Sequence, residues 1–243
     1  MSILVFLGLF LPVLISGLSL YFFKINNRIL KLLIAFSGAF LLSLSFNEIV
    51  PHIYSSGHAH SVGIFVLIGF FIQLMLDYIT KGVEHGHQHN IAESKHNHHS
   101  ISYIPILIGV CLHSFLEGMP LAENAVDPEL QHHLLMGIAI HNLPISIVLM
   151  SLFIESEIKK SKAIILLLVF ALSSPIGAIT SSLLGSNVFE SLHEYFDSIM
   201  AVVVGIFLHI STTILFETDE NHRFNFIKFI TIIIGAIIPF IHF

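Results

Sequence analysis

The sequence contains eight apolar segments, each of about the length that a helix needs to cross a membrane. A bilayer core takes roughly 20 apolar residues per helix. Short polar connections separate the segments, except for one longer insert at residues 81–100. The segments are 2–23, 29–54, 61–80, 101–124, 131–154, 161–185, 195–216 and 225–242. We therefore predict an all-α membrane protein of eight transmembrane helices, with residues 1–243 forming a single transmembrane domain.

The composition agrees with a chain that faces lipid. Only 11% of its residues are charged and 55% are hydrophobic, whereas soluble domains have about 25% charged residues. The lipid bilayer is therefore the expected partner, and no nucleic acid is expected. The first segment lacks a basic start and an A-x-A-like cleavage site, which predicts a retained span. One cysteine excludes a thiolate cluster, so nitrogen and oxygen would have to hold any metal.

Basic residues predict the orientation, because Lys and Arg concentrate in the short cytoplasmic loops of membrane proteins. All 10 of them belong to alternate connections, the first, third, fifth and seventh. They are Lys24, Arg28, Lys31, Lys81, Lys95, Lys159, Lys160, Lys162, Arg223 and Lys228. This separation predicts a multi-pass protein of the cell membrane with both termini outside and residues 81–100 in the cytoplasm.

Ionisable residues in the fourth and fifth segments form the strongest candidate site. Such residues are costly at membrane depth and are functional candidates by default. His113 and Glu117 share a helical face because they are four residues apart. His141 lies near the middle of the next, antiparallel segment, and Pro144 should kink that helix and free the carbonyl of Ile140. We predict a metal site here; the alternative is that His113 and Glu117 only tie helices together.

Three further polar residues are candidates for an ion pathway. Glu48 and His52 lie toward the outer end of the second segment, where they could form an entrance or a hydrogen-bonded rim. His209 lies in the seventh segment. It could belong to the pathway, or neighbouring hydroxyl groups could satisfy it within the helix bundle. Cys111 falls on another helical face than His113 and is expected to pack in the core.

The insert between the third and fourth segments is rich in histidine, a composition typical of weak, multivalent metal binding. Its alternatives are an engineered tag or a solvated linker, but its irregular sequence and embedded position favour metal binding. The candidate ligands are His85, His87, His89, His96, His98 and His99.

Three motifs, taken in order, resemble those of the ZIP (Zrt/Irt-like) family of divalent metal transporters, and the resemblance extends over essentially the full chain. The fourth-segment motif, approximately H-N/S-x-x-E/D-G, matches His113, Ser114, Glu117 and Gly118. The fifth-segment motif, approximately H-E/N/D-x-P-E/H, matches His141, Asn142 and Pro144. The string Gly205-Ile206-Phe207-Leu208-His209 is similar to the family's G-x-F-L-Y/H.

The resemblance implies a 3+2+3 arrangement. Spans one to three and six to eight would be related by an inverted repeat, and spans four and five would lie between them and carry the metal. It also implies transport toward the cytoplasm without ATP hydrolysis, in a protein that is not an enzyme and needs no catalytic cofactor. Family members are often dimers, so a homodimer is a further implication.

The chain departs from the family pattern at positions that would hold metal. Ile145 replaces a ligand that usually follows the fifth-span proline, and Ser114 and Asn142 stand where a second ion is often held. We therefore predict one principal ion, held by His113, Glu117 and His141, with Asn142 and water completing its shell.

Zinc is the first candidate for this ion, and Fe, Mn, Co or Ni suit the same ligands. Two other functions stay open. The chain could be an intramembrane zinc-dependent hydrolase, with zinc on His113, His141 and His209 and with Glu117 as general base. Alternatively, it could be a metal-sensing relative that does not transport, because Ile145 has replaced a ligand.

Overall fold

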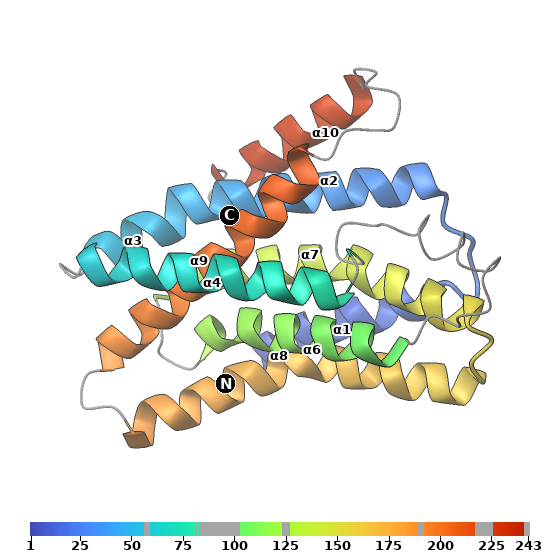
Figure 1. Ribbon diagram of the computed structural model, residues 1–243, viewed down its shortest axis with the longest axis horizontal. Coiled ribbons are helices and arrows are strands. Elements are labelled where there is room, and N and C mark those ends of the chain that lie inside the picture. The colour runs from blue at the N-terminus through green and yellow to red at the C-terminus, as the bar shows by residue number, and fades with distance from the viewer. Residues whose placement is uncertain are drawn as a thin grey trace.

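The computed structural model describes residues 1–55, 59–80, 82, 103–122, 127–188, 192–216 and 226–240. Over these residues the chain is helical and contains no strand (Figure 1). The α-helices are α1 (Ile3–Ser19), α2 (Asn27–Leu44), α3 (Val50–Ser55), α4 (Ala59–Thr80), α6 (Tyr103–Gly118), α7 (Pro128–Glu155), α8 (Lys160–Val188), α9 (Leu192–Phe216) and α10 (Phe226–Ile237). Shorter segments are the π-helical η1 (Ser45–Ile49) and the 3₁₀-helical η4 (Met119–Leu121) and η5 (Ile238–Phe240).

The all-α membrane class is confirmed. Six helical stretches among the described residues are long and apolar enough to cross a bilayer. The second of the expected spans is built from α2, η1 and α3 in succession. The expected first and eighth spans are apolar helices too, but they are shorter. α1 has 17 residues and is therefore about 26 Å long, slightly less than a bilayer core of about 30 Å.

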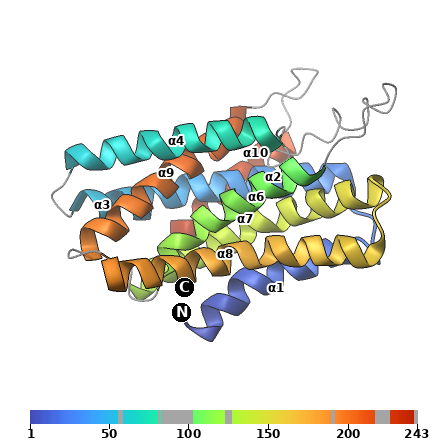
Figure 2. The same ribbon diagram turned by 60° about the horizontal axis from the view of Figure 1, so that its bottom comes forward.

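Two groups of helices make most of the contacts. One group contains α1, α6, α7 and α8, and the other contains α2, α4, α9 and α10. α1 and α8 lie on the opposite side of the bundle from α2 and α10 in both views (Figures 1 and 2). α7 also packs on α2, and α6 on α4, so these two pairs join the groups. The residues of the candidate site lie where the groups meet.

Two described connections between helices lie at the same end of the bundle (Figures 1 and 2). The first follows α1 and the other joins α7 to α8. Lys160 Nζ lies 4.3 Å from the centre of the Tyr21 ring, a cation–π contact between these two connections. The first and fifth connections are therefore close in space at this end of the bundle.

Glycines allow two pairs of helices to approach very closely. A Cβ atom on Gly177 of α8 would lie 2.0 Å from the Phe115 carbonyl oxygen, and one on Gly118 of α6 would lie 2.1 Å from that of Ser174. Gly69 of α4 and Gly205 of α9 meet the partner helix's backbone in the same way. Small residues at helix crossings are a common means of packing in membranes, where apolar side chains gain little from leaving lipid. The first crossing fixes α6, which carries two residues of the candidate site.

The α6–α8 crossing should be sensitive to one methyl group. We expect Gly177→Ala to lower the thermal unfolding temperature in detergent, because overpacking costs about 1–3 kcal/mol and the obstacle is a backbone oxygen. Gly63→Ala in α4 is the control, since only the Tyr54 hydroxyl lies within reach, at 4.0 Å. It should be neutral or stabilising, because alanine favours a helix over glycine. Equal unfolding temperatures for Gly177→Ala and wild type would contradict this reading of the crossing.

Candidate metal site between α6 and α7

His113 and Glu117 lie one helical turn apart on α6 and are both fully buried. His113 Nε2 is 3.0 Å from Glu117 Oε1. The i, i+4 spacing produces this contact, since such residues are neighbours on a helix surface. The two side chains point into the bundle rather than toward lipid.

α7 brings His141 to the same place. His141 Nε2 lies 3.9 Å from Glu117 Oε1, and the two imidazole rings are 5.7 Å apart and nearly perpendicular. One ligand atom from each of His113, Glu117 and His141 lies within 4.8 Å of the other two. It is the one group of three potential ligands from His, Cys, Asp or Glu found in the described part of the chain.

The spacing of these atoms suits a tetrahedral metal ion. Zinc binds imidazole nitrogen and carboxylate oxygen at about 2.0–2.2 Å, which places neighbouring ligand atoms about 3.4 Å apart. The two distances to Glu117 Oε1, 3.0 Å and 3.9 Å, lie on either side of that value. Small side-chain movements would therefore bring two nitrogens and one oxygen to bonding distance.

Asn142 and Ser114 make contacts of other kinds. Asn142 Nδ2 donates to Glu117 Oε2 over 3.5 Å, so the amide supports the carboxylate from the side away from the imidazoles. Ser114 Oγ is 2.6 Å from Ser174 Oγ, and this hydrogen bond crosses from α6 to α8. Direct binding of metal by Asn142 or Ser114 stays a prediction.

α7 runs as one helix through Pro144, and the residues after this proline pack against other helices. Ile145 is 1% exposed and belongs to the main apolar core, and its alkyl side chain has no atom that could bind a metal. The Ser146 hydroxyl donates to the carbonyl oxygen of Leu143 and also contacts Ser16 of α1. This stretch anchors α7 to α1 instead of extending the ligand set.

Gln73 of α4 is a site residue that the sequence reasoning did not identify. Its Oε1 atom lies 2.9 Å from His113 Nδ1, and both side chains are fully buried. A sequence signal did exist, because Gln73 is an uncharged polar residue in the middle of an otherwise apolar stretch. Its partner could not be inferred, since α4 and α6 belong to different helix groups.

A second pair of potential ligands lies between the π-helical segment η1 and α7. Glu48 Oε1 is 3.9 Å from His133 Nδ1; His133 is buried, and the Glu48 side chain keeps 24% of its exposure. His133 was also missed, although it precedes His141 by eight residues and so lies on a similar face of the helix. His52, in α3, is half-buried.

His209 of α9 lies apart from the cluster of three ligands. Its ring packs edge-to-face on Phe70 of α4, with ring centres 5.0 Å apart. Thr212 and Thr213 donate their hydroxyl hydrogens to the backbone carbonyl of His209. The predicted loop ligands lie outside the described residues: His85, His87, His89, His96, His98 and His99.

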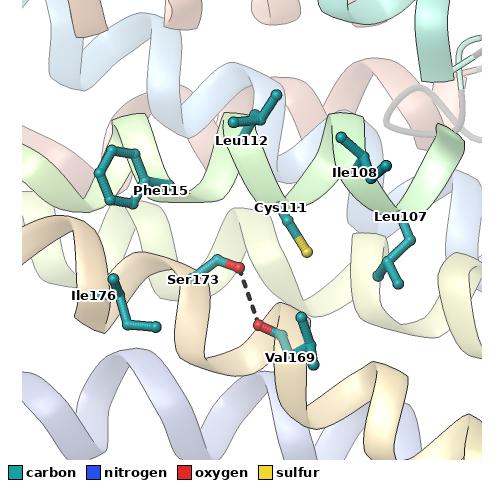
Figure 3. A pocket seen from close by; sticks show the side chains of 8 residues that line it. All are labelled: Leu107, Ile108, Cys111, Leu112, Phe115, Val169, Ser173 and Ile176. Carbon is teal, nitrogen blue, oxygen red and sulfur yellow. Dashed lines mark hydrogen bonds between the residues drawn. The ribbon is translucent and has the colours of Figure 1, made fainter. Parts of the chain in front are cut away.

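Cys111 faces the other side of α6, toward α8 (Figure 3). It lines an apolar groove of about 320 Å³ together with Leu107, Phe115 and Ile176. Ser173, at the same groove, donates its hydroxyl hydrogen to the Val169 carbonyl over 3.0 Å. The thiol packs against the core, as expected, and takes no part in the cluster of His113, Glu117 and His141.

Comparison with known proteins supports the family that the motifs suggest. The chain is 26% identical over 166 residues to Zinc transporter ZIP9 of Xenopus tropicalis and to Zinc transporter ZIP9-A of Xenopus laevis. It is 25% identical over 167 residues to Zinc transporter ZIP9 of Micropogonias undulatus. Each alignment covers 66% of this chain and 53% of the relative, so the chain spans about half the length of these curated relatives.

A family match covers a similar share of the sequence and is more decisive. Residues 84–242 match the family described as "ZIP Zinc transporter". This range is well over half of the chain and contains His113, Glu117 and His141. The chain is therefore a multi-pass membrane protein that belongs to the ZIP zinc transporter family.

Proposed function

We propose that this protein carries a divalent transition metal, zinc before the others, across the membrane toward the cytoplasm. The observation that carries the proposal is the convergence of His113, Glu117 and His141 in the buried interior of a bundle of membrane-crossing helices. Ionisable side chains at such depth are costly and mark ion pathways. Family membership and the names of the relatives, which are zinc transporters, point to the same cargo.

The ligand chemistry defines the class of metal. Two imidazoles and one carboxylate suit Zn, Fe, Mn, Co and Ni, whereas Cu(I) prefers the sulfur of cysteine or methionine. The one cysteine of the chain faces the groove at α8. The metal is cargo in this proposal, and no catalytic cofactor is involved.

The charge of the site favours release as well as binding. A divalent cation held by Glu117 and two neutral imidazoles leaves one net positive charge. Uncompensated charge is costly in a medium of low polarity. An ion must be able to leave a transport site, so moderate affinity is an advantage. Ile145, which occupies the position of a further family ligand, contributes to this balance.

The outer approach to the site is assigned to Glu48, His133 and His52. α7 rises about 12 Å over the eight residues from His133 to His141, and Gly137 lies halfway between them. Leu44 and Phe40 of α2 cover Gly137, where an added Cβ atom would lie 2.8 Å from Leu44. An ion would pass from Glu48 and His133, past this apolar contact, to the inner ligands. His209 is a further candidate for the pathway.

The proposed orientation places both termini outside the cell membrane. It is supported by the basic residues of alternate connections and by the contact between Lys160 and Tyr21 at one end of the bundle. Metal would then arrive on the side of the His-rich loop, residues 81–100. We also propose that residues 1–243 form a single domain with the 3+2+3 arrangement of helices. The protein is proposed to assemble as a homodimer.

The geometry gives less support to a zinc-dependent hydrolase. A general base must reach the proton of a bound water, whereas Glu117 Oε1 lies among the proposed ligand atoms. His209, the third zinc ligand of that alternative, lies outside the cluster. A metal sensor that does not transport would have the same site, and only a flux measurement separates it from a transporter.

The central test is metal uptake into proteoliposomes. Loss of a residue that only supports a metal ligand typically lowers metal affinity or activity by roughly 10- to 100-fold. His113→Ala and Glu117→Ala each remove a proposed ligand itself, so we expect them to lower zinc uptake by at least this factor. Cys111→Ser on the same helix should retain uptake, since the thiol faces α8. If the wild type carries none of Zn, Fe, Mn, Co and Ni, or if both alanine variants match it, the proposal is wrong.

Glu48 and His133 should affect the capture of the ion from outside rather than its passage through the inner site. We expect Glu48→Gln to raise the KM for zinc uptake several-fold and to leave the maximal rate nearly unchanged, because the amide no longer attracts the cation. His132→Ala is the control, since this histidine is exposed on the same turn as His133. A fall in maximal rate without a change in KM would argue against a capture role.

The His-rich loop is expected to be accessory. Deleting residues 85–99 should change the affinity or the regulation of uptake and leave basal flux intact, because the proposed transport ligands lie in α6 and α7. Initial uptake rates over a range of zinc concentrations test this expectation. Abolished flux would show that the loop is part of the transport machinery.

A further inference from the structure

Gln73 links α4 to the cluster of His113, Glu117 and His141 through a hydrogen bond with His113. The residues around it in the sequence are apolar: Phe70, Phe71 and Ile72 precede it, and Leu74, Met75 and Leu76 follow it. A buried amide is costly unless it is hydrogen-bonded, and Gln73 is fully buried. The hydrogen bond with His113 therefore offsets the cost of burying the Gln73 amide.

This contact restricts the chemistry of the His113 ring. Gln73 Oε1 is a carbonyl oxygen and can only accept a hydrogen bond. Nδ1, 2.9 Å away, must therefore carry the hydrogen. A neutral imidazole has one N–H and one lone pair, so the lone pair is then on Nε2. That nitrogen is the one that faces Glu117 Oε1 at 3.0 Å.

We propose that Gln73 is a positioning residue that holds His113 with Nδ1 protonated and with the lone pair of Nε2 directed at the transported ion. This inference rests on the proposed function and adds a residue to it. Metal-binding histidines commonly donate the hydrogen of the other ring nitrogen to an oxygen acceptor, which fixes both the tautomer and the orientation of the ring. Gln73 supplies that acceptor from a different helix.

The arrangement also explains why a cation is attractive at this position. With Nδ1 protonated, Nε2 and Glu117 Oε1 are two acceptor atoms facing each other, and a metal ion between them interacts favourably with both. Rotation of the ring by half a turn would lose the bond to Gln73. The hydrogen bond therefore keeps the site ready for the ion.

Nitrogen-15 NMR of histidine-labelled protein in nanodiscs tests the tautomer directly. Spectra are recorded in alkaline buffer, where imidazoles are neutral, and the His113 signals are identified by their loss in His113→Ala. We expect the Nδ1–H form in wild type and in Gln73→Glu, which retains an oxygen acceptor. Gln73→Leu should lose it. Finding the Nε2–H form in the wild type would overturn the inference without recourse to any variant.

Zinc uptake gives a second and independent readout. Gln73→Leu should raise the KM by roughly 10- to 100-fold, the usual effect of losing such a partner, and Gln73→Glu should restore it to within a few-fold of wild type. Thr80→Val is the control for a buried polar change on α4, since the Thr80 hydroxyl bonds the Asp77 carbonyl. An unchanged KM in Gln73→Leu would overturn the inference and leave the transport function intact. Failure of wild-type transport would reject the function, while the NMR result would still decide the tautomer.

Discussion

The structure depends on the burial of one carboxylate inside a bundle that is otherwise largely apolar. Glu117 has no exposed surface, and an unpaired carboxylate at this depth would cost several kcal/mol. Groups from two helices surround it: the imidazoles of His113 and His141 and the amide of Asn142. The Asn142 amide faces Oε2 of Glu117, and the two imidazoles face Oε1. Oε1 is therefore the oxygen that would meet a cation.

This arrangement requires helices that approach one another closely and stay in register. Gly118 follows Glu117 and permits backbone contact with α8. Ser114 then reaches Ser174, which fixes the rotation of α6 about its own axis. α7 is held in turn by the contact between Ser146 and Ser16 of α1. Small and hydroxyl-bearing residues therefore set the positions of the two helices that carry His113, Glu117 and His141.

Much of the site could be predicted from sequence because its central residues follow local rules. His113 and Glu117 are paired by the helical repeat, and His141 could be matched to them by its depth in the next span. Gln73 and His133 could not be paired with their partners, because those contacts depend on how helices rotate and tilt against one another. The π-helical η1 was not predicted either. A π-helical turn contains about one residue more than an α-helical turn, and no pattern in the sequence indicates where this occurs. The length of α1 was overestimated because apolar residues continue in the sequence beyond Ser19, where the helix ends.

The solitary cysteine has a practical consequence for observing this protein. Cys111 is the one thiol in the 243-residue sequence, and it lies two positions from His113 on the opposite side of α6, in an apolar groove. A membrane-soluble fluorophore or spin label attached there would need no prior removal of other cysteines. It would report on α6 from the face away from His113 and Glu117. These 243 residues therefore already contain a single labelling position for following movements of α6.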